Sequence, residues 1–453
     1  MVFFGVLQRR MMKSFAISLF LAAINLQAAI GWADRGKQVI SGYYPSYNAH
    51  IQPPSKIPWS HYTHIDYFVA PVQDDPGNPL KIENETNLIE TVKLAKAHNV
   101  SISLCVGGWT GSKFFSNLVK TDGSRQKFTT SLVQIIKKYN FDGVDLDWEY
   151  PGVPGEEGNI ISPLDTENFL KFLKLLRKKF GRNYRISAAV SVKGFMGADG
   201  KYLKDTKAFA KVLDYITIMA YDIYVAGAGR SLSGPNAPLF HTCSDPQSKF
   251  SVSGAIKTWI KSGFHSRKIL LGLPAYGYAY TLLSSELKPT KFSGLKQKES
   301  LLFQNTTAKP PQGGKISATP GHWLYHELYL DEKLAKDGRR GTSGYKRHFD
   351  ECTRTPFLFN KENKNLIVYD DRRSIFEKAL FAKSKDLGGI NIFDTTGDTP
   401  DRKLVETIRV LYSKKEADKK PSESEGVKKN SFSLKKTCGK SFKLKQSSKY
   451  SKA

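Results

Sequence analysis

Residues 141–150 read Phe-Asp-Gly-Val-Asp-Leu-Asp-Trp-Glu-Tyr and alternate acidic with apolar side chains. Successive side chains of a β-strand point to opposite faces, so the alternation predicts a strand with two unlike faces. One face carries Asp145, Asp147 and Glu149, and the other carries Val144, Leu146 and Trp148. We expect the apolar face to pack against helices. Three carboxyls along one buried face are unfavourable, because like charges raise one another's pKa, so this face calls for a functional explanation.

Apolar runs of strand length recur along the chain, and segments with helical spacing lie between them. Several runs are nearly continuous in Val, Ile, Leu and aromatic residues, as expected of strands buried on both faces. The predicted strands are Val39–Tyr44, Ile65–Val72, Ile102–Val106, Gly143–Trp148, Ile186–Val192, Tyr215–Ala220, Ile269–Leu273 and Gly389–Phe393. The clearest predicted helices are Asn87–His98, Thr166–Phe180 and Ser374–Ser384.

Eight strands that alternate with helices favour an α/β fold of the (β/α)8 TIM-barrel type. A doubly wound open sheet is the alternative. In a barrel the acidic face would point inward and rise toward the mouth at the carboxyl ends of the strands, where barrel active sites lie. The interval 280–365 is too long for one helix and is rich in Gly, Pro, Ser and Tyr, so we expect a small inserted α+β domain there.

The 453 residues are 40% hydrophobic and 25% charged, a composition typical of a folded chain and not of a disordered one. The net charge is +27. Part of it is local, since residues 414–453 carry 13 Lys and 4 acidic residues. We expect 413–453 to be a basic, disordered tail that attracts anionic cell-wall polymers or is merely solvated. No nucleic-acid motif accompanies the charge, so we expect no nucleic-acid partner.

The first residues are typical of a targeting signal. Arg9, Arg10 and Lys13 precede an uncharged run from Ser14 to Ala33, so we expect residues 1–33 to be a signal peptide and residues 34–412 to form the secreted domain, extracellular or in the cell wall. The run approaches the length of a membrane span, so a retained anchor stays open, although we expect no stable membrane insertion.

The four cysteines are Cys105, Cys243, Cys352 and Cys438. Export permits disulfides; Cys243 and Cys352 lie in loop-like sequence and are able to pair, whereas Cys105 lies in an apolar run and is expected to be a buried thiol. The cysteine spacing gives no zinc pattern. We expect neither a metal nor a cofactor.

Three carboxyls along one strand face fit acid–base chemistry, because at least one of them must hold a proton near neutral pH. A carboxyl that holds its proton is what a glycosidase needs to protonate a leaving oxygen. A buried salt-bridge ladder or a cation site are the alternatives, although oxygen-ligand metal sites usually take their ligands from a loop.

At this point the sequence resembles glycoside hydrolase family 18, the chitinase family. The family motif Asp-x-x-Asp-x-Asp-x-Glu is intact as Asp142, Asp145, Asp147 and Glu149, followed by the typical Tyr-Pro. The resemblance extends from about Val39 to Leu411. Further matching stretches are Gly42-Tyr43-Tyr44, Gly107-Gly108-Trp109, Met219-Ala220-Tyr221-Asp222, Gly272-Leu273-Pro274-Ala275-Tyr276-Gly277 and Val368-Tyr369-Asp370-Asp371. Many members of the family carry a chitinase insertion domain where the long interval lies.

The resemblance implies a retaining, substrate-assisted hydrolysis of β-1,4-linked N-acetylglucosamine, with chitin or chito-oligosaccharides as partners. Glu149 would protonate the glycosidic oxygen while the acetamide carbonyl of the sugar attacks the anomeric carbon. Asp147 would hold the acetamide N–H, and Asp145 would share a proton with Asp147. Tyr221 would hydrogen-bond the acetamide carbonyl. Asp222 and Met219 would line the same subsite, and Asp142, which has the opposite strand parity, would have a supporting role.

Aromatic residues at strand ends are candidates for sugar stacking or for ordinary core packing. The candidates are Tyr43, Trp109 with the preceding Gly108, and Tyr276. Three positions depart from the family pattern. Cys105 replaces a serine, Phe393 replaces the tryptophan that floors the central subsite, and Tyr278 replaces an arginine. These departures bear on affinity and chain-length preference more than on the chemistry.

Other functions stay open at this stage. A lectin-like chitin-binding member without catalysis is one, an endo-β-N-acetylglucosaminidase is a second, and a basic surface-interaction protein is a third. The four intact motif acids favour catalysis, and the insertion-like segment favours chitin as substrate.

Overall fold

A computed structural model describes residues 38–229, 231–241, 250–290, 299–317 and 319–413. The predicted signal peptide 1–33 lies outside these residues. Of the predicted tail 413–453, only Ser413 is described, as the last residue of a helix. No helix in the described ranges is long and apolar enough to cross a membrane.

Eight parallel strands close into a barrel in the order β1-β13-β7-β6-β5-β4-β3-β2. Their bounds are β1 Val39–Pro45, β2 His64–Ala70, β3 Ser101–Gly107, β4 Gly143–Asp147, β5 Arg185–Val190, β6 Tyr215–Met219, β7 Ile269–Pro274 and β13 Gly389–Phe393. The prediction of a (β/α)8 barrel is confirmed, and each predicted strand overlaps an observed one. The open-sheet alternative is wrong, because β1 pairs with both β2 and β13 and leaves no edge.

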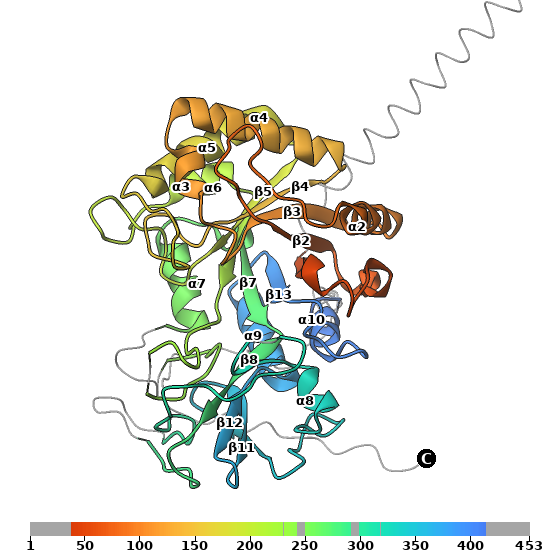
Figure 1. Cartoon of the computed structure of the whole chain (residues 1–453), viewed down its shortest axis with the longest axis vertical. Helices are drawn as coiled ribbons and strands as arrows, with labels where there is room; N and C mark the ends of the chain where they lie inside the picture. Colours follow the sequence, from red (N-terminus) through yellow and green to blue (C-terminus); the bar gives the residue numbers. More distant parts are fainter. Residues whose placement is uncertain (1–37, 230, 242–249, 291–298, 318, 414–453) are drawn as a thin grey trace, which may run out of the picture. The chain divides into compact units, whose positions relative to one another are not determined.

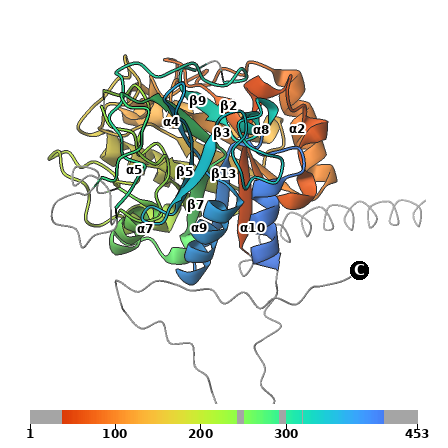
Figure 2. The same ribbon diagram turned by 90° about the horizontal axis from the view of Figure 1, so that it is seen from below.

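Helices surround these strands (Figure 2). They are α2 Glu85–Ala97, α3 Phe115–Val119, α4 Asp122–Lys138, α5 Asp165–Phe180, α6 Lys207–Val212, α7 Val252–Lys261, α9 Arg372–Ser384 and α10 Lys403–Ser413. The short 3-10 turns are η1 Ser46–Asn48, η2 Pro54–Lys56, η3 Trp59–His61 and η4 Ser266–Lys268. Side-chain caps fix several starts, as where Asp371 accepts hydrogen bonds from the first-turn N–H groups of α9.

The two faces of β4 have the environments that their residues require. Trp148, which follows β4, stacks on Phe115 of α3 with ring centroids 5.1 Å apart and meets Phe169 of α5 edge-on at 5.5 Å. Val144 and Leu146 are fully buried in the same layer. The opposite face of β4 points into the barrel, where it meets polar side chains from β1, β3 and β5.

A second, antiparallel sheet has the order β10-β11-β12-β8-β9. Its strands are β8 Tyr276–Thr281, β9 His322–Leu324, β10 Lys346–Asp350, β11 Thr355–Asn360 and β12 Asn365–Val368, and the short helix α8 spans Glu327–Leu330. In Figure 1, β8 follows directly from barrel strand β7. The sheet extends beyond both ends of the segment 280–365, because β8 begins at Tyr276, with only Ala275 between it and β7, and β12 continues to Val368.

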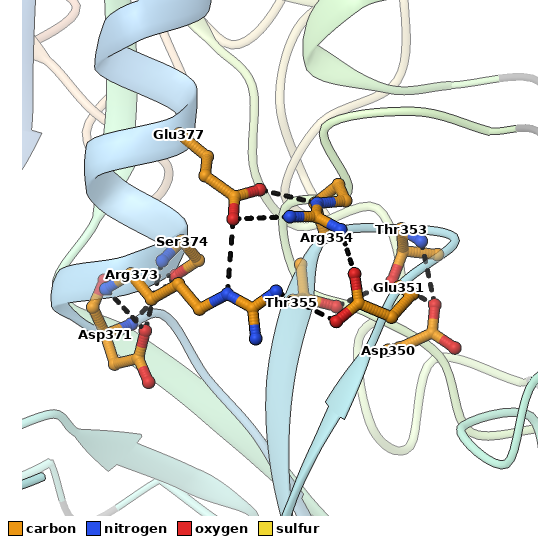
Figure 3. Close-up of polar contacts among 9 residues, drawn as sticks. All are labelled: Asp350, Glu351, Thr353, Arg354, Thr355, Asp371, Arg373, Ser374 and Glu377. Atoms are coloured by element: carbon orange, nitrogen blue, oxygen red, sulfur yellow. Dashed lines mark hydrogen bonds and ion pairs between the residues drawn. The ribbon is translucent and has the colours of Figure 1, made fainter. Parts of the chain in front are cut away.

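A network of ion pairs joins this sheet to barrel helix α9 (Figure 3). Arg354 donates from Nε and Nη2 to the two carboxylate oxygens of Glu377 at 2.5 and 2.6 Å. Arg373 donates to Glu377 at 3.2 Å and to Glu351 at 2.8 Å, and Arg354 also pairs with Glu351. Single surface pairs contribute little to stability, but here a bidentate pair belongs to a network of four charges. The network therefore fastens the loop between β10 and β11 to the start of α9.

The cysteines fall into two groups. Cys105 is a free, buried thiol, as predicted, and Cys352 is disulfide-bonded. Cys243 and Cys438 lie outside the described residues, so the predicted pairing of Cys243 with Cys352 stays a prediction.

Candidate active site

The inward face of β4 forms a buried ladder of carboxyls. Asp145, Asp147 and Glu149 are 1%, 3% and 9% exposed, so burial decreases toward the C-terminal mouth of the barrel. Asp145 is held by side chains from two other barrel strands. Tyr43 on β1 donates to its Oδ2 at 2.8 Å, and Ser187 on β5 donates to its Oδ1 at 2.6 Å.

Asp145 has an altered affinity for protons. Burial raises the pKa of Asp145 to about 7, with a further contribution from the charge of Asp66. The hydrogen bonds from Ser187 and Tyr43 act in the opposite direction, because they stabilise the carboxylate. The Cys105 thiol also approaches Asp145 at 3.6 Å, so the residue that replaces the usual serine keeps contact with the ladder.

Asp147 lies in the middle of the ladder and is poorly satisfied. Its Oδ1 is buried and has no hydrogen-bond partner in the described structure. Burial raises its pKa well above the ordinary value, and the charges of Glu149 and Asp145 raise it further. A buried polar atom without a partner is unfavourable, so this oxygen is available to accept a hydrogen bond from a bound molecule.

Glu149 is the outermost acid and its backbone is fixed on both sides. Its N–H donates to Ser112 Oγ at 3.0 Å, and its C=O accepts from Asn159 Nδ2 at 3.1 Å. Burial raises the pKa of Glu149 to about 7, and the charge of Asp222 adds to the rise. Glu149 therefore retains its proton near neutral pH at the open end of the ladder, as a general acid requires.

The residues after β6 form another part of the mouth, close to the ladder. Tyr221 is buried, and Asp222 accepts hydrogen bonds from Tyr276 and Tyr278 at 2.7 Å each. Asp222 has a φ of +57°, a left-handed conformation that non-glycine residues seldom adopt. Its N–H donates to Asn236 Oδ1 at 2.8 Å, which helps to hold that conformation. Met219 at the end of β6 is half-buried.

Phe393 lies at the centre of an aromatic cluster at the end of β13. Its ring centroid is 5.3 Å from that of Phe68, 5.5 Å from Tyr43, 6.0 Å from Tyr221 and 6.1 Å from Tyr276. The position where related enzymes are expected to carry tryptophan is thus still aromatic. It connects rings from β1, β2, β8 and the segment after β6.

The other predicted aromatic residues divide into two kinds. Trp109 is 47% exposed and presents a ring to solvent, as a sugar-stacking residue must. Tyr43 and Tyr276 are buried, and their hydroxyls hold Asp145 and Asp222, so they position acids and do not offer an open stacking face.

Glycine is required before Trp109. Gly107 and Gly108 have φ values of +110° and +80°, and a Cβ on Gly107 would lie 2.2 Å from the carbonyl oxygen of Asp147. The N–H of Gly108 donates to that same oxygen at 2.8 Å. Only a residue without a side chain permits this close approach.

Asp142 lies apart from the ladder, in accordance with its opposite strand parity. It forms an ion pair with Lys96 of α2 and accepts a hydrogen bond from the N–H of Ile102 at 2.9 Å. These contacts tie the start of β4 to β3 and to α2. Asp142 therefore supports the strand that carries the other acids.

Asp66, which was not among the predicted site residues, lies deeper in the barrel and is buried. Ser41 donates to Asp66 at 2.8 Å, and His64 Nε2 lies 2.9 Å from its other oxygen. Burial raises the pKa of Asp66 to about 7, and its charge in turn raises the pKa of Asp145 and Asp147. The sequence did contain a signal for Asp66. His64 and Asp66 stand two residues apart in an apolar run, and this spacing places both on the same face of a strand.

No group of three or more His, Cys, Asp or Glu residues within the described ranges is arranged to hold a metal ion. Within the ladder, hydroxyl donors hold Asp145, and burial raises the pKa of all three acids. This arrangement suits proton transfer, and its negative charge suits the stabilisation of a cation that develops nearby.

Comparison with known proteins agrees with this geometry. The sequence model of glycosyl hydrolases family 18 matches residues 39–398. The chain belongs to this family. The match begins at β1 and ends just after β13, so it covers all eight barrel strands and the second sheet.

Related family 18 proteins carry different names. A chitinase-like effector of Moniliophthora roreri is 34% identical over 407 residues, which cover 87% of this chain and 97% of that protein. Chitinase A1 of Niallia circulans is 28% identical over 85% of this chain and 60% of its own length. The crystal structure of a chitinase from Rhizomucor miehei superposes with a TM-score of 0.72 at 27% identity, over 83% of this chain and all of that one. These relatives support a glycosidase.

Proposed function

We propose that this family 18 protein is a chitinase that hydrolyses β-1,4-linked N-acetylglucosamine chains. The observation that carries the proposal is the buried ladder itself. Its outermost acid, Glu149, has a pKa of about 7 and so holds the proton that a leaving glycosidic oxygen must receive.

The geometry supports a retaining mechanism assisted by the substrate. Glu149 protonates the oxygen between two sugars, and the carbonyl oxygen of the neighbouring N-acetyl group attacks the anomeric carbon to give an oxazolinium ion. The buried, unpartnered Oδ1 of Asp147 suits the acetamide N–H. Water then opens the oxazolinium ion, and Glu149 accepts the proton of that water, which restores the starting state.

Neighbouring residues prepare the ladder for this step. Asp145, held by Tyr43 and Ser187, exchanges a proton with Asp147 and so adjusts the charge next to the developing cation. The buried hydroxyl of Tyr221 donates a hydrogen bond to the acetamide carbonyl in this mechanism. Phe393 floors the central subsite, and the exposed ring of Trp109 stacks on a sugar further along the chain.

One specific observation favours a second candidate, a chitin-binding protein with weak catalysis. The relatives from Moniliophthora roreri and Moniliophthora perniciosa are both named chitinase-like effectors, at 34% and 32% identity. Phe393 offers less stacking area than the expected tryptophan. An endo-β-N-acetylglucosaminidase is a third candidate, and it would be tested by supplying an N-glycan core as substrate in place of chitin.

The decisive experiment compares purified protein with the Glu149→Gln variant on chito-hexaose. Turnover by the native chain, loss of turnover in the variant and retained binding in both would support a chitinase. The new reducing end, observed by NMR before mutarotation, should form first as the β-anomer, because the proposed mechanism retains the configuration of the cleaved bond. Binding without turnover in the native chain would instead establish the lectin-like candidate, and turnover only of glycan cores would establish the third.

We also propose that the protein is secreted, and that residues 414–453 hold it on anionic wall polymers. The sequence pattern of the first 33 residues and the 13 lysines of the tail support this. Wall binding by full-length protein should weaken with salt and should be lost on removal of the tail.

A further inference from the structure

A pocket lies where the second sheet meets the outer helices of the barrel, away from the ladder of acids. It has a volume of about 420 Å³, within the usual range of small-molecule sites. Its wall comes from three parts of the chain: the segment from Tyr325 to Arg347, the first turn of α9, and Thr407 of α10. None of the residues assigned to hydrolysis lines it.

Four arginines line this pocket: Arg339, Arg347, Arg372 and Arg373. Two of them are neutralised. Arg347 pairs with Asp371 at 2.5 Å, and Arg373 pairs with Glu351 and Glu377 (Figure 3). The Nε of Arg347 is nevertheless buried without a hydrogen bond of normal geometry within the described ranges.

The other two arginines have no counter-ion in the described part of the chain. Arg339 and Arg372 form no ion pair there, and their guanidinium groups make no hydrogen bond to described residues. Besides Asp371, the pocket wall contains one other acid, Asp337. Its Oδ2 lies 3.7 Å from Nε of Arg340, which is outside the pocket, and its Oδ1 accepts a hydrogen bond from the backbone N–H of Arg339 at 2.8 Å. Arg339 and Arg372 are both exposed, and they therefore line one pocket without a counter-ion among the described residues.

The pocket also offers apolar surface beside these cations. Phe376 is 43% exposed on α9, and the buried ring of Tyr325 forms part of the opposite wall. An arginine fork matches the planar, doubly accepting geometry of a phosphate, sulfate or carboxylate. An adjacent aromatic ring suits the apolar face of a sugar or a similar ring.

We propose that this pocket binds a small organic anion, in which an oxyanion group pairs with Arg339 and Arg372 and a ring packs on Phe376. The shared chemistry is the oxyanion, and phosphorylated, sulfated and carboxylated sugars are its possible sources. The site is separate from the hydrolytic one and does not depend on the proposed chitinase activity. A ligand there would bridge the second sheet and helices α9 and α10.

The test is calorimetric titration of the full chain with inorganic phosphate, inorganic sulfate, glucose 6-phosphate, glucosamine 6-sulfate and glucuronate. At least one of these sugar anions should bind more tightly than inorganic phosphate or sulfate, because the ring adds contact. Arg339→Gln with Arg372→Gln should weaken that binding at least tenfold, since two charge-assisted hydrogen-bond partners are removed. Phe376→Ala should weaken the sugar anion but not the inorganic ion.

The net charge of +27 makes a matched control necessary. Lys179→Gln with Arg182→Gln removes two exposed positive charges at the far end of α5, outside the pocket. Unchanged affinity in this control, together with the loss in the arginine pair, would support the site. Equal loss in both variants, or no measurable binding of any probe, would overturn it. Both outcomes are independent of chitin turnover, and saturating chito-hexaose should leave the anion affinity unchanged.

Discussion

Replacing Glu149 by glutamine should make the protein both inactive and, at alkaline pH, more stable. Glutamine keeps the shape of the side chain and its place beside Tyr150, but it has no proton to give. General acid catalysis contributes about 10²–10⁴ in rate, so turnover of chito-hexaose should fall by at least about a hundredfold. The gain in stability follows from the same burial that equips Glu149 for its role.

The sign of the stability effect comes from the raised pKa. Burial holds the pKa of Glu149 at about 7, above its ordinary value of 4.5, so the unfolded chain ionises first as the pH rises. Ionisation then destabilises the folded state between those two values and by a constant amount above them. The separation corresponds to about 3 kcal/mol, most of which develops between pH 5 and pH 8.

The assay is urea denaturation of the native chain and the variant at pH 5 and at pH 8. The free energy of unfolding of Glu149→Gln, relative to the native chain, should rise by roughly 2 kcal/mol between the two conditions. Any cost of the amide that does not depend on pH cancels in this comparison. A matched control is Glu167→Gln on the exposed face of α5, which should change neither turnover nor this difference appreciably.

Two results would refute the reasoning. If the variant keeps more than about a tenth of the native rate, Glu149 is not the general acid. If its relative stability stays constant or falls as the pH rises, the carboxyl does not hold a proton near neutrality in the folded chain.

Four further predictions concern other parts of the molecule. Asp147→Asn should lower kcat on chito-hexaose by at least about tenfold while binding remains measurable by calorimetry, and fully deacetylated chitosan should be cut poorly by the native chain; rapid chitosan hydrolysis would contradict substrate assistance. The rate should fall about tenfold for each pH unit above about 7, because Glu149 loses its proton; a pH–rate profile that is flat to pH 9 would exclude this assignment. Phe393→Trp should lower KM for chito-oligosaccharides through added stacking area, at a stability cost of about 1–3 kcal/mol that thermal unfolding would measure; an unchanged KM would show that this ring does not floor the subsite. Deleting the residues after Ser413 should leave activity on soluble oligomers intact, and loss of that activity would show that the tail is structural.

The barrel was predictable because most of its strands are buried on both faces, so they are apolar runs that can be recognised without knowing which strands they pair with. Strand pairing in the second sheet was not predictable in the same way. β10 contains Lys346, Arg347 and His348, and is a strand only because it pairs with β11. Only Ala275 separates β7 from β8, so the sequence shows one continuous apolar segment where the structure has two sheets.

For the site, parity along β4 was enough to place three acids on one face, because alternation is a local property. What holds those acids depends on contacts between distant strands. Ser187 is an ordinary serine in an apolar run until β5 brings it to Asp145. Tyr278 was a departure from a pattern, and its role as a donor to Asp222 follows only from the fold. Asp66 was visible as a charge in a strand, but its effect on Asp145 depends on barrel closure.

The pairing of β1 with β13 also has a consequence during synthesis. Val39 is hydrogen-bonded alongside Gly389, roughly 350 residues later, so the ribosome must make nearly all of the described chain before the barrel can close. At usual rates of elongation, this interval lasts on the order of tens of seconds. Throughout it, β1 presents one unpaired edge, which is a template for pairing with another nascent chain. Aggregation during expression should therefore depend on how fast β13 emerges, and chaperones that shield strand edges should improve the yield of soluble protein.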